Sequence, residues 1–122
     1  MSDQTVHGQY KHQVEAKTAD YTVVAASDNG KVFSSKGASG TITFALPAAT
    51  VGQRYYFYVG ATQQLRIDPN GTETISLPSS GVAGAAGKYL VADAIGETVE
   101  LVCCEAGTWA AFAFTGTWTA EG

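Results

Sequence analysis

The chain has 122 residues, of which 45% are hydrophobic and 15% are charged, and its formal net charge is −4. This length fits one domain. Its 7 Lys and Arg residues are scattered among 11 acidic ones, which excludes the clustered positive charge that a nucleic-acid partner needs. No apolar run approaches the roughly 20 residues of a membrane helix, and the opening stretch lacks the apolar centre of a signal peptide. We therefore expect a soluble protein, made in a cytoplasm, with no membrane partner.

Residues 1–20 differ in composition from the rest and are expected to form a flexible N-terminal arm. Val6, Tyr10 and Val14 recur at a spacing of four, but a glycine interrupts this weak helical stripe. A segment with so few large apolar side chains buries too little area to order itself alone, so it is expected to fold only against a partner. Residues 21–122 are then expected to form a β-domain.

From Tyr21 onward, short strand patterns alternate with turn signals. Asn29-Gly30, between "YTVVAA" and "KVFSS", is the strongest short signal for a β-hairpin. In "TITFAL", large apolar residues alternate with small ones, and the large ones define one buried face: Ile42, Phe44 and Leu46. The proline that follows ends this strand because it cannot donate to a ladder.

The remaining chain continues in the same way through "QRYYFYVG", "QLRI", "ETISL", "KYLVA", "ETVELVCC" and "AGTWAAFAF". Strands that recur roughly every 8 to 12 residues, with turns between them, are typical of a sandwich or a barrel. We predict a single compact all-β domain, a β-sandwich or barrel of about eight to ten short antiparallel strands, with an extended N-terminal arm.

The strand "RYYFYV" carries aromatic residues on both faces. Alternation places Tyr55 and Phe57 on one face and Tyr56 and Tyr58 on the other. A domain of this size has one core, so the second face has two interpretations. Tyr56 and Tyr58 form an oligomer interface, or they coat the outer face of a monomer with their hydroxyls in water.

The sequence offers no catalytic constellation. The two histidines, His7 and His12, fall in the predicted arm, where nothing holds a base beside a nucleophile. Glu97 and Glu100 flank a strand that buries its apolar residues, so they are interpreted as solvated rim residues and not as paired acids. We predict that the protein is not an enzyme and that it needs no cofactor.

Metal binding is not expected either. Asp68, Asn70 and Glu73 superficially suggest calcium, but the sequence Asp-Pro-Asn-Gly is what a tight turn requires. Cys103 and Cys104 are adjacent and therefore point to opposite faces of a strand, which argues against a disulfide between them. They are interpreted as small apolar residues in a reducing compartment, with a reactive or intersubunit thiol as the alternative.

Several segments resemble a pattern in accessory virion proteins of tailed bacteriophages. They are "GKVFSSKGASGTITFALPAATVGQRYYFYV", "LRIDPNGTETISL", "SSGVAGAAG" and the closing "GTW…GTW". In that family a Gly-rich turn precedes an "ITF-x-LP-x-A" strand, an aromatic strand follows, and a Trp-containing hairpin closes the module. The resemblance covers about residues 21–118. Similar modules occur in capsid decoration proteins, head fibres and tail fibres.

The resemblance implies a small decoration protein that cements the capsid surface of the virion as a homotrimer. The major capsid protein is the expected partner, contacted by the arm around Val6, Tyr10 and Val14, while Tyr56 and Tyr58 join the copies. The alternative is a receptor- or glycan-binding module of a head or tail fibre, whose candidate residues are Trp109, Trp118, Arg66 and the loop 79–87. Core packing is the other interpretation of the two tryptophans.

Overall fold

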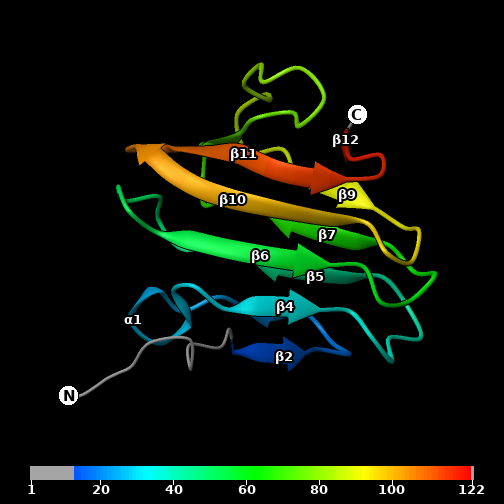
Figure 1. Ribbon diagram of the computed structural model, residues 1–122. Helices are drawn as coiled ribbons and strands as arrows, with labels where there is room; N and C mark the ends of the chain where they lie inside the picture. The colour runs from blue at the N-terminus through cyan, green and yellow to red at the C-terminus, as the bar shows by residue number, and fades with distance from the viewer. Residues whose placement is uncertain (1–12, 122) are drawn as a thin grey trace, which may run out of the picture.

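The computed structural model describes residues 13–121, which fold into two β-sheets packed face to face (Figure 1). The six-stranded sheet has the order β2-β4-β6-β10-β11-β8 and the five-stranded sheet the order β12-β9-β7-β5-β3. The strands of the first sheet are β2 (Val14–Ala16), β4 (Val32–Ser34), β6 (Arg54–Tyr58), β8 (Thr74–Ile75), β10 (Thr98–Glu105) and β11 (Thr108–Thr115). Those of the second are β3 (Tyr21–Thr22), β5 (Ile42–Ala45), β7 (Leu65–Asp68), β9 (Leu90–Ala92) and β12 (Thr119–Ala120).

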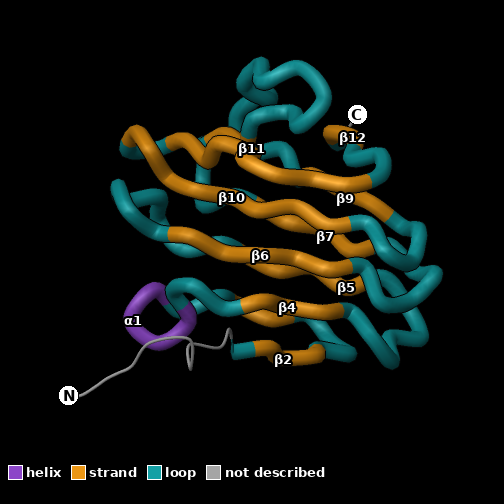
Figure 2. The backbone as a smooth tube through the Cα atoms, viewed as in Figure 1, coloured by secondary structure: helices purple, strands orange, loops and turns teal. Residues whose placement is uncertain are grey.

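The all-β prediction is confirmed, and of the two predicted architectures the described chain forms two open sheets and not a closed barrel. Strands dominate the body, and α1 (Ala25–Asp28), a single helical turn, lies at one end beside β4 (Figure 2). We predicted eight to ten strands, whereas the described residues form eleven, several of them only two residues long.

The prediction of purely antiparallel strands is wrong, because both sheets are mixed. The pairs β2–β4, β4–β6, β5–β7, β3–β5 and β8–β11 are parallel. From β2 to β10 the chain changes sheet at every strand, so strands next to each other in a sheet are separated by a strand of the other sheet. Among the described strands, only β10 and β11 are both consecutive and paired, through a tight turn with Gly107 at φ 86°.

The hairpin predicted at Asn29-Gly30 does not form. The strand before it, β3, belongs to the five-stranded sheet, whereas β4 after it belongs to the six-stranded sheet. A two-residue type I′ turn needs positive φ at both central residues, and Asn29 has φ −58° while Gly30 has φ 85°. Asn29 ends α1 instead, and its side-chain Oδ1 accepts a hydrogen bond from the amide of Arg54 at 2.8 Å.

One core joins the two sheets, and the alternating patterns correctly predicted which faces build it. Phe33 and Phe57 come from the six-stranded sheet and Phe44 from the five-stranded one. The ring of Phe44 lies 5.4 Å from each of the other two, between centroids, so aromatic packing ties the sheets together. The other large buried side chains that meet there are Tyr55, Trp109, Ile42, Leu65, Ile67, Leu90, Leu101, Val23 and Val59.

Candidate binding surfaces

The strand β6 has the two apolar faces that its sequence predicts. Phe57 and Tyr55 are buried in the core, whereas Tyr56 and Tyr58 are half-buried on the outer face of the six-stranded sheet. Because β6 lies between β4 and β10, its outward tyrosines have a strand on each side. Tyr56 is paired in register with Val32 on one side and Glu100 on the other.

The outer tyrosines border a shallow apolar hollow of about 240 Å³. It is lined by Val32, Tyr56, Phe57, Tyr58, Thr98, Val99, Glu100 and Ala113. Among these described residues only Glu100 is charged, and its carboxylate lies 3.7 Å from the guanidinium of Arg54, which also lies 5.9 Å from the ring of Tyr56. This surface, called the tyrosine face below, is therefore mainly apolar, and its single charged lining residue is paired with Arg54.

Of the three residues expected to contact the capsid, only Val14 lies in the part of the chain that the structure describes. Val6 and Tyr10 lie outside the described residues. Val14, within the range predicted for the arm, is the first residue of β2 and is 64% exposed. It is paired in register with Val32, a lining residue of the tyrosine face, so this end of the sheet extends the apolar surface.

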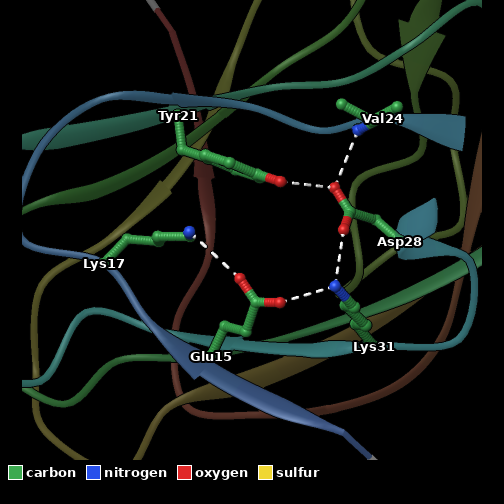
Figure 3. Close-up of polar contacts among 6 residues, drawn as sticks. All are labelled: Glu15, Lys17, Tyr21, Val24, Asp28 and Lys31. Carbon is green, nitrogen blue, oxygen red and sulfur yellow. Dashed lines mark hydrogen bonds and ion pairs between the residues drawn. The ribbon is translucent and has the colours of Figure 1, made fainter.

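A cluster of polar contacts joins side chains of β2 and β3 to α1 (Figure 3). The carboxylate of Asp28, a residue only 1% exposed, accepts hydrogen bonds from the Tyr21 hydroxyl at 2.7 Å, the Val24 amide at 2.8 Å and the Lys31 ammonium at 2.8 Å. Lys31 also pairs with Glu15 of β2. The cluster thus connects the edge strands of both sheets through one buried carboxylate.

Every charge of this cluster is paired, which explains the shifted acidities. Burial raises the pKa of Asp28, but hydrogen bonds from Lys31, Tyr21 and the Val24 amide outweigh it, so the pKa lies below its ordinary value. The hydrogen bond to Asp28, followed by burial, raises the pKa of Tyr21. Hydrogen bonds from Lys31 and Lys17 lower the pKa of Glu15. These groups satisfy one another, so the cluster stabilises the fold and holds no acid or base poised for proton transfer.

Of the two interpretations of the tryptophans, a glycan site or core packing, the structure supports core packing. Trp109 is fully buried against Tyr55, with 5.6 Å between ring centroids, and Trp118 is 5% exposed with its indole N–H donating to the Thr98 carbonyl at 3.0 Å. Both tryptophans are therefore core residues. Phe112 and Phe114 of the same strand as Trp109, β11, are by contrast 60% and 41% exposed.

The acidic turn is built as its sequence predicts. The Glu73 amide donates to the Asn70 carbonyl at 3.0 Å, Gly71 has φ 56°, and the Glu73 carboxylate accepts from the Ala49 amide at 2.9 Å. Within residues 13–121 no group of three or more His, Cys, Asp or Glu side chains converges as a metal site. Cys103 is buried and Cys104 exposed, both as free thiols.

The sequence matches no protein-family model and no curated protein. In the part of the chain that the structure describes, no helix is long and apolar enough to cross a membrane.

Proposed function

We propose that the chain is a non-enzymatic structural protein that decorates and cements the capsid surface of a tailed-phage virion. The tyrosine face carries this proposal. A sheet that covers a core with one face normally leaves the other face wet and polar, whereas here half-buried tyrosines surround an apolar hollow on the outer face. Tyrosines on a mainly apolar surface whose one lining charge is paired suit a protein partner.

In this proposal, copies meet as a trimer through Tyr56 and Tyr58, and the arm contacts the major capsid protein around Val6, Tyr10 and Val14. A protein that binds only the assembled shell stabilises that state by mass action. Three arms on one trimer make the second and third contacts intramolecular, which raises the overall affinity. The paired cluster around Asp28 supports this arrangement because it holds β2, which contains Val14, in a fixed position.

Co-sedimentation of the full-length chain with undecorated expanded phage shells tests the proposal. We expect saturable binding, with a bound copy number in multiples of the trimer. Light scattering should show a trimer for the wild type and a monomer for the double variant Tyr56→Ser, Tyr58→Ser, because both outward rings are lost while the inward residues of β6 stay. The matched control is Val82→Ser, an exposed apolar residue in the loop 79–87.

A second variant separates the arm from the trimer contact. Deletion of residues 1–12 leaves β2 and its ion pairs in place, whereas deletion to residue 20 would also remove Glu15 and Lys17 from the cluster. We expect the shorter deletion to keep the trimer and to lose shell binding. Undiminished shell binding by this variant would exclude the arm as the contact, and absence of binding by the wild type would exclude the cementing role.

A further inference from the structure

The outer face of the five-stranded sheet carries a polar group that the cementing role does not use. Ile67 of β7 and Ala120 of β12 are both paired in register with Leu90 of β9. Ile67 and Leu90 are buried, so the residues one step along point outward. Asp68 follows Ile67, Tyr89 precedes Leu90 and Glu121 follows Ala120. These three residues therefore lie side by side in one row on the outer face.

Backbone contacts fix this row. The Glu121 amide donates to the Tyr89 carbonyl at 2.9 Å, and the Tyr89 amide donates to Glu121 Oε1 at 3.1 Å. Burial, followed by the charge of Glu121, raises the pKa of Asp68, which agrees with two carboxylates on the same surface. The Tyr89 ring therefore lies in a row between two acceptor groups.

Arg66 is held in one orientation beside the ring. Its Nε and Nη2 donate to Gln64 Oε1 at 3.0 and 2.8 Å, and its guanidinium carbon lies 4.6 Å from the Tyr89 ring centroid. Its neighbours in register, Thr43 and Val91, are uncharged. Among the ion pairs of the described residues none includes Arg66. A guanidinium has five N–H donors, so a pre-oriented group with donors to spare faces outward.

Charges of both signs lie close together around the Tyr89 ring. Lys88 Nζ lies 4.0 Å from Glu121 Oε2, and the positive Arg66 stands two residues from Asp68 on the same face of β7. A negatively charged ligand would be repelled by the carboxylates of Asp68 and Glu121. A cation would find the Tyr89 ring already covered by the Arg66 guanidinium. A neutral ligand with many hydroxyls can instead accept from the guanidinium and donate to the carboxylates.

We propose that this surface, formed by Arg66, Asp68, Tyr89 and Glu121, binds a neutral saccharide. Outward residues on one strand are spaced by about 6.6 Å and neighbouring strands by about 4.8 Å, which matches the spread of hydroxyls around a pyranose ring. The site retains Arg66 from the predicted glycan residues and replaces the two buried tryptophans with Tyr89. It lies on the opposite sheet from the tyrosine face (Figure 1), so it is independent of the cementing role.

Titration of the full-length, nitrogen-15-labelled protein with the methyl glycosides of glucose, galactose, mannose and N-acetylglucosamine tests this site by NMR. With at least one of them we expect saturable shifts of the Arg66 Nε–H signal and of the amides of residues 66–68 and 89–91. Absence of a saturable shift with all four, or shifts confined to the tyrosine face, would overturn the proposal. Glucuronate and glucosamine are the charged comparisons, and tighter binding of either one contradicts a neutral ligand.

Two variants test the residue assignment. Arg66→Ala should weaken binding at least about tenfold, because hydrogen bonds to a charged group are lost. Gln64→Ala leaves the charge but releases the guanidinium, so its loss of affinity should be smaller. Arg54→Ala removes an exposed arginine from the other sheet and should bind as the wild type does. Equal affinities for the wild type and Arg66→Ala would refute the assignment, and the wild-type titration decides the matter if that variant does not fold.

Discussion

Substitution of Asp28 tests how much the polar cluster between the two sheets contributes to stability. Asp28→Ala removes the acceptor of three hydrogen bonds, from Tyr21, Val24 and Lys31. The residue is 1% exposed, so water does not replace the lost oxygen atoms. Lys31 keeps its pairing with Glu15, which reduces the loss.

The expected magnitude follows from these contacts. Removing one partner of a buried ion pair costs about 3–5 kcal/mol, and a buried donor left without an acceptor costs about 1–3 kcal/mol. Because Lys31 retains one carboxylate, we expect the lower end for Asp28→Ala, a loss of about 3 kcal/mol in the free energy of unfolding. For a domain of this size that loss lowers Tm by roughly 10 °C.

Urea unfolding followed by tryptophan fluorescence measures this effect, because Trp109 and Trp118 are 0% and 5% exposed and both report on the core. The midpoint should fall while the m-value stays constant. Asp93→Ala is the matched control, since Asp93 is exposed and its loss should change stability by at most about 0.5 kcal/mol. Surface ion pairs contribute up to about 1 kcal/mol. If Asp28→Ala lowers the free energy of unfolding by less than this, the cluster does not act as a buried ion pair and the reasoning is refuted.

The same cluster gives a pH dependence with a definite sign. The pKa of Asp28 is lower in the folded chain than its ordinary value, so its contribution is present above the unfolded pKa of about 3.9 and is lost as the pH falls through the folded pKa. The stability difference between the wild type and Asp28→Ala should therefore narrow as the pH falls below about 4. A difference that stays constant through this range would show that the charge of Asp28 contributes nothing.

Three further outcomes are expected from the packing. Gly60→Ala places a Cβ 2.8 Å from a backbone nitrogen and should cost about 1–3 kcal/mol by urea unfolding, whereas Gly40→Ala, with nothing within 4 Å, should cost nothing. Tyr55→Phe removes a buried hydroxyl that has no partner among the described residues, so stability should stay the same or rise by up to about 1 kcal/mol; a loss above that size would reveal a bound partner. A thiol reagent should label Cys104 in the native protein and Cys103 only after unfolding, because Cys103 is 1% exposed and burial raises its pKa; mass spectrometry after native labelling checks this.

The sequence was most informative about which side of each strand is buried. The alternation in 54–59 correctly separated Phe57 from Tyr56, and the pattern in 42–46 correctly identified the core face of β5. Alternation works here because it reflects a local geometric fact, the opposite directions of successive side chains. For the same reason it also predicted the tyrosine face, as a second apolar face on β6.

Strand pairing could not be predicted in the same way, because it depends on contacts far apart in the chain. Asn29-Gly30 has the composition of a hairpin turn, yet the residues before it form α1, where the Asp28 carboxylate accepts a hydrogen bond from the Val24 amide. The strands on either side, β3 and β4, belong to different sheets. The same limit applies to the saccharide site. Tyr89 and Arg66 are 23 positions apart and meet only because β7 and β9 are paired, so no local motif marks them.

The two outer faces of the sandwich differ in chemistry, and that difference separates the two proposals. The tyrosine face is mainly apolar and its single lining charge is paired with Arg54, so burial against a protein there leaves no charge uncompensated. The opposite face keeps Arg66 oriented and outside any described ion pair, a costly arrangement to bury under a flat protein surface but a suitable one for a small hydroxyl-rich ligand. A protein partner is thus expected on one sheet and a saccharide on the other, so a variant on either face should impair one activity and leave the other intact.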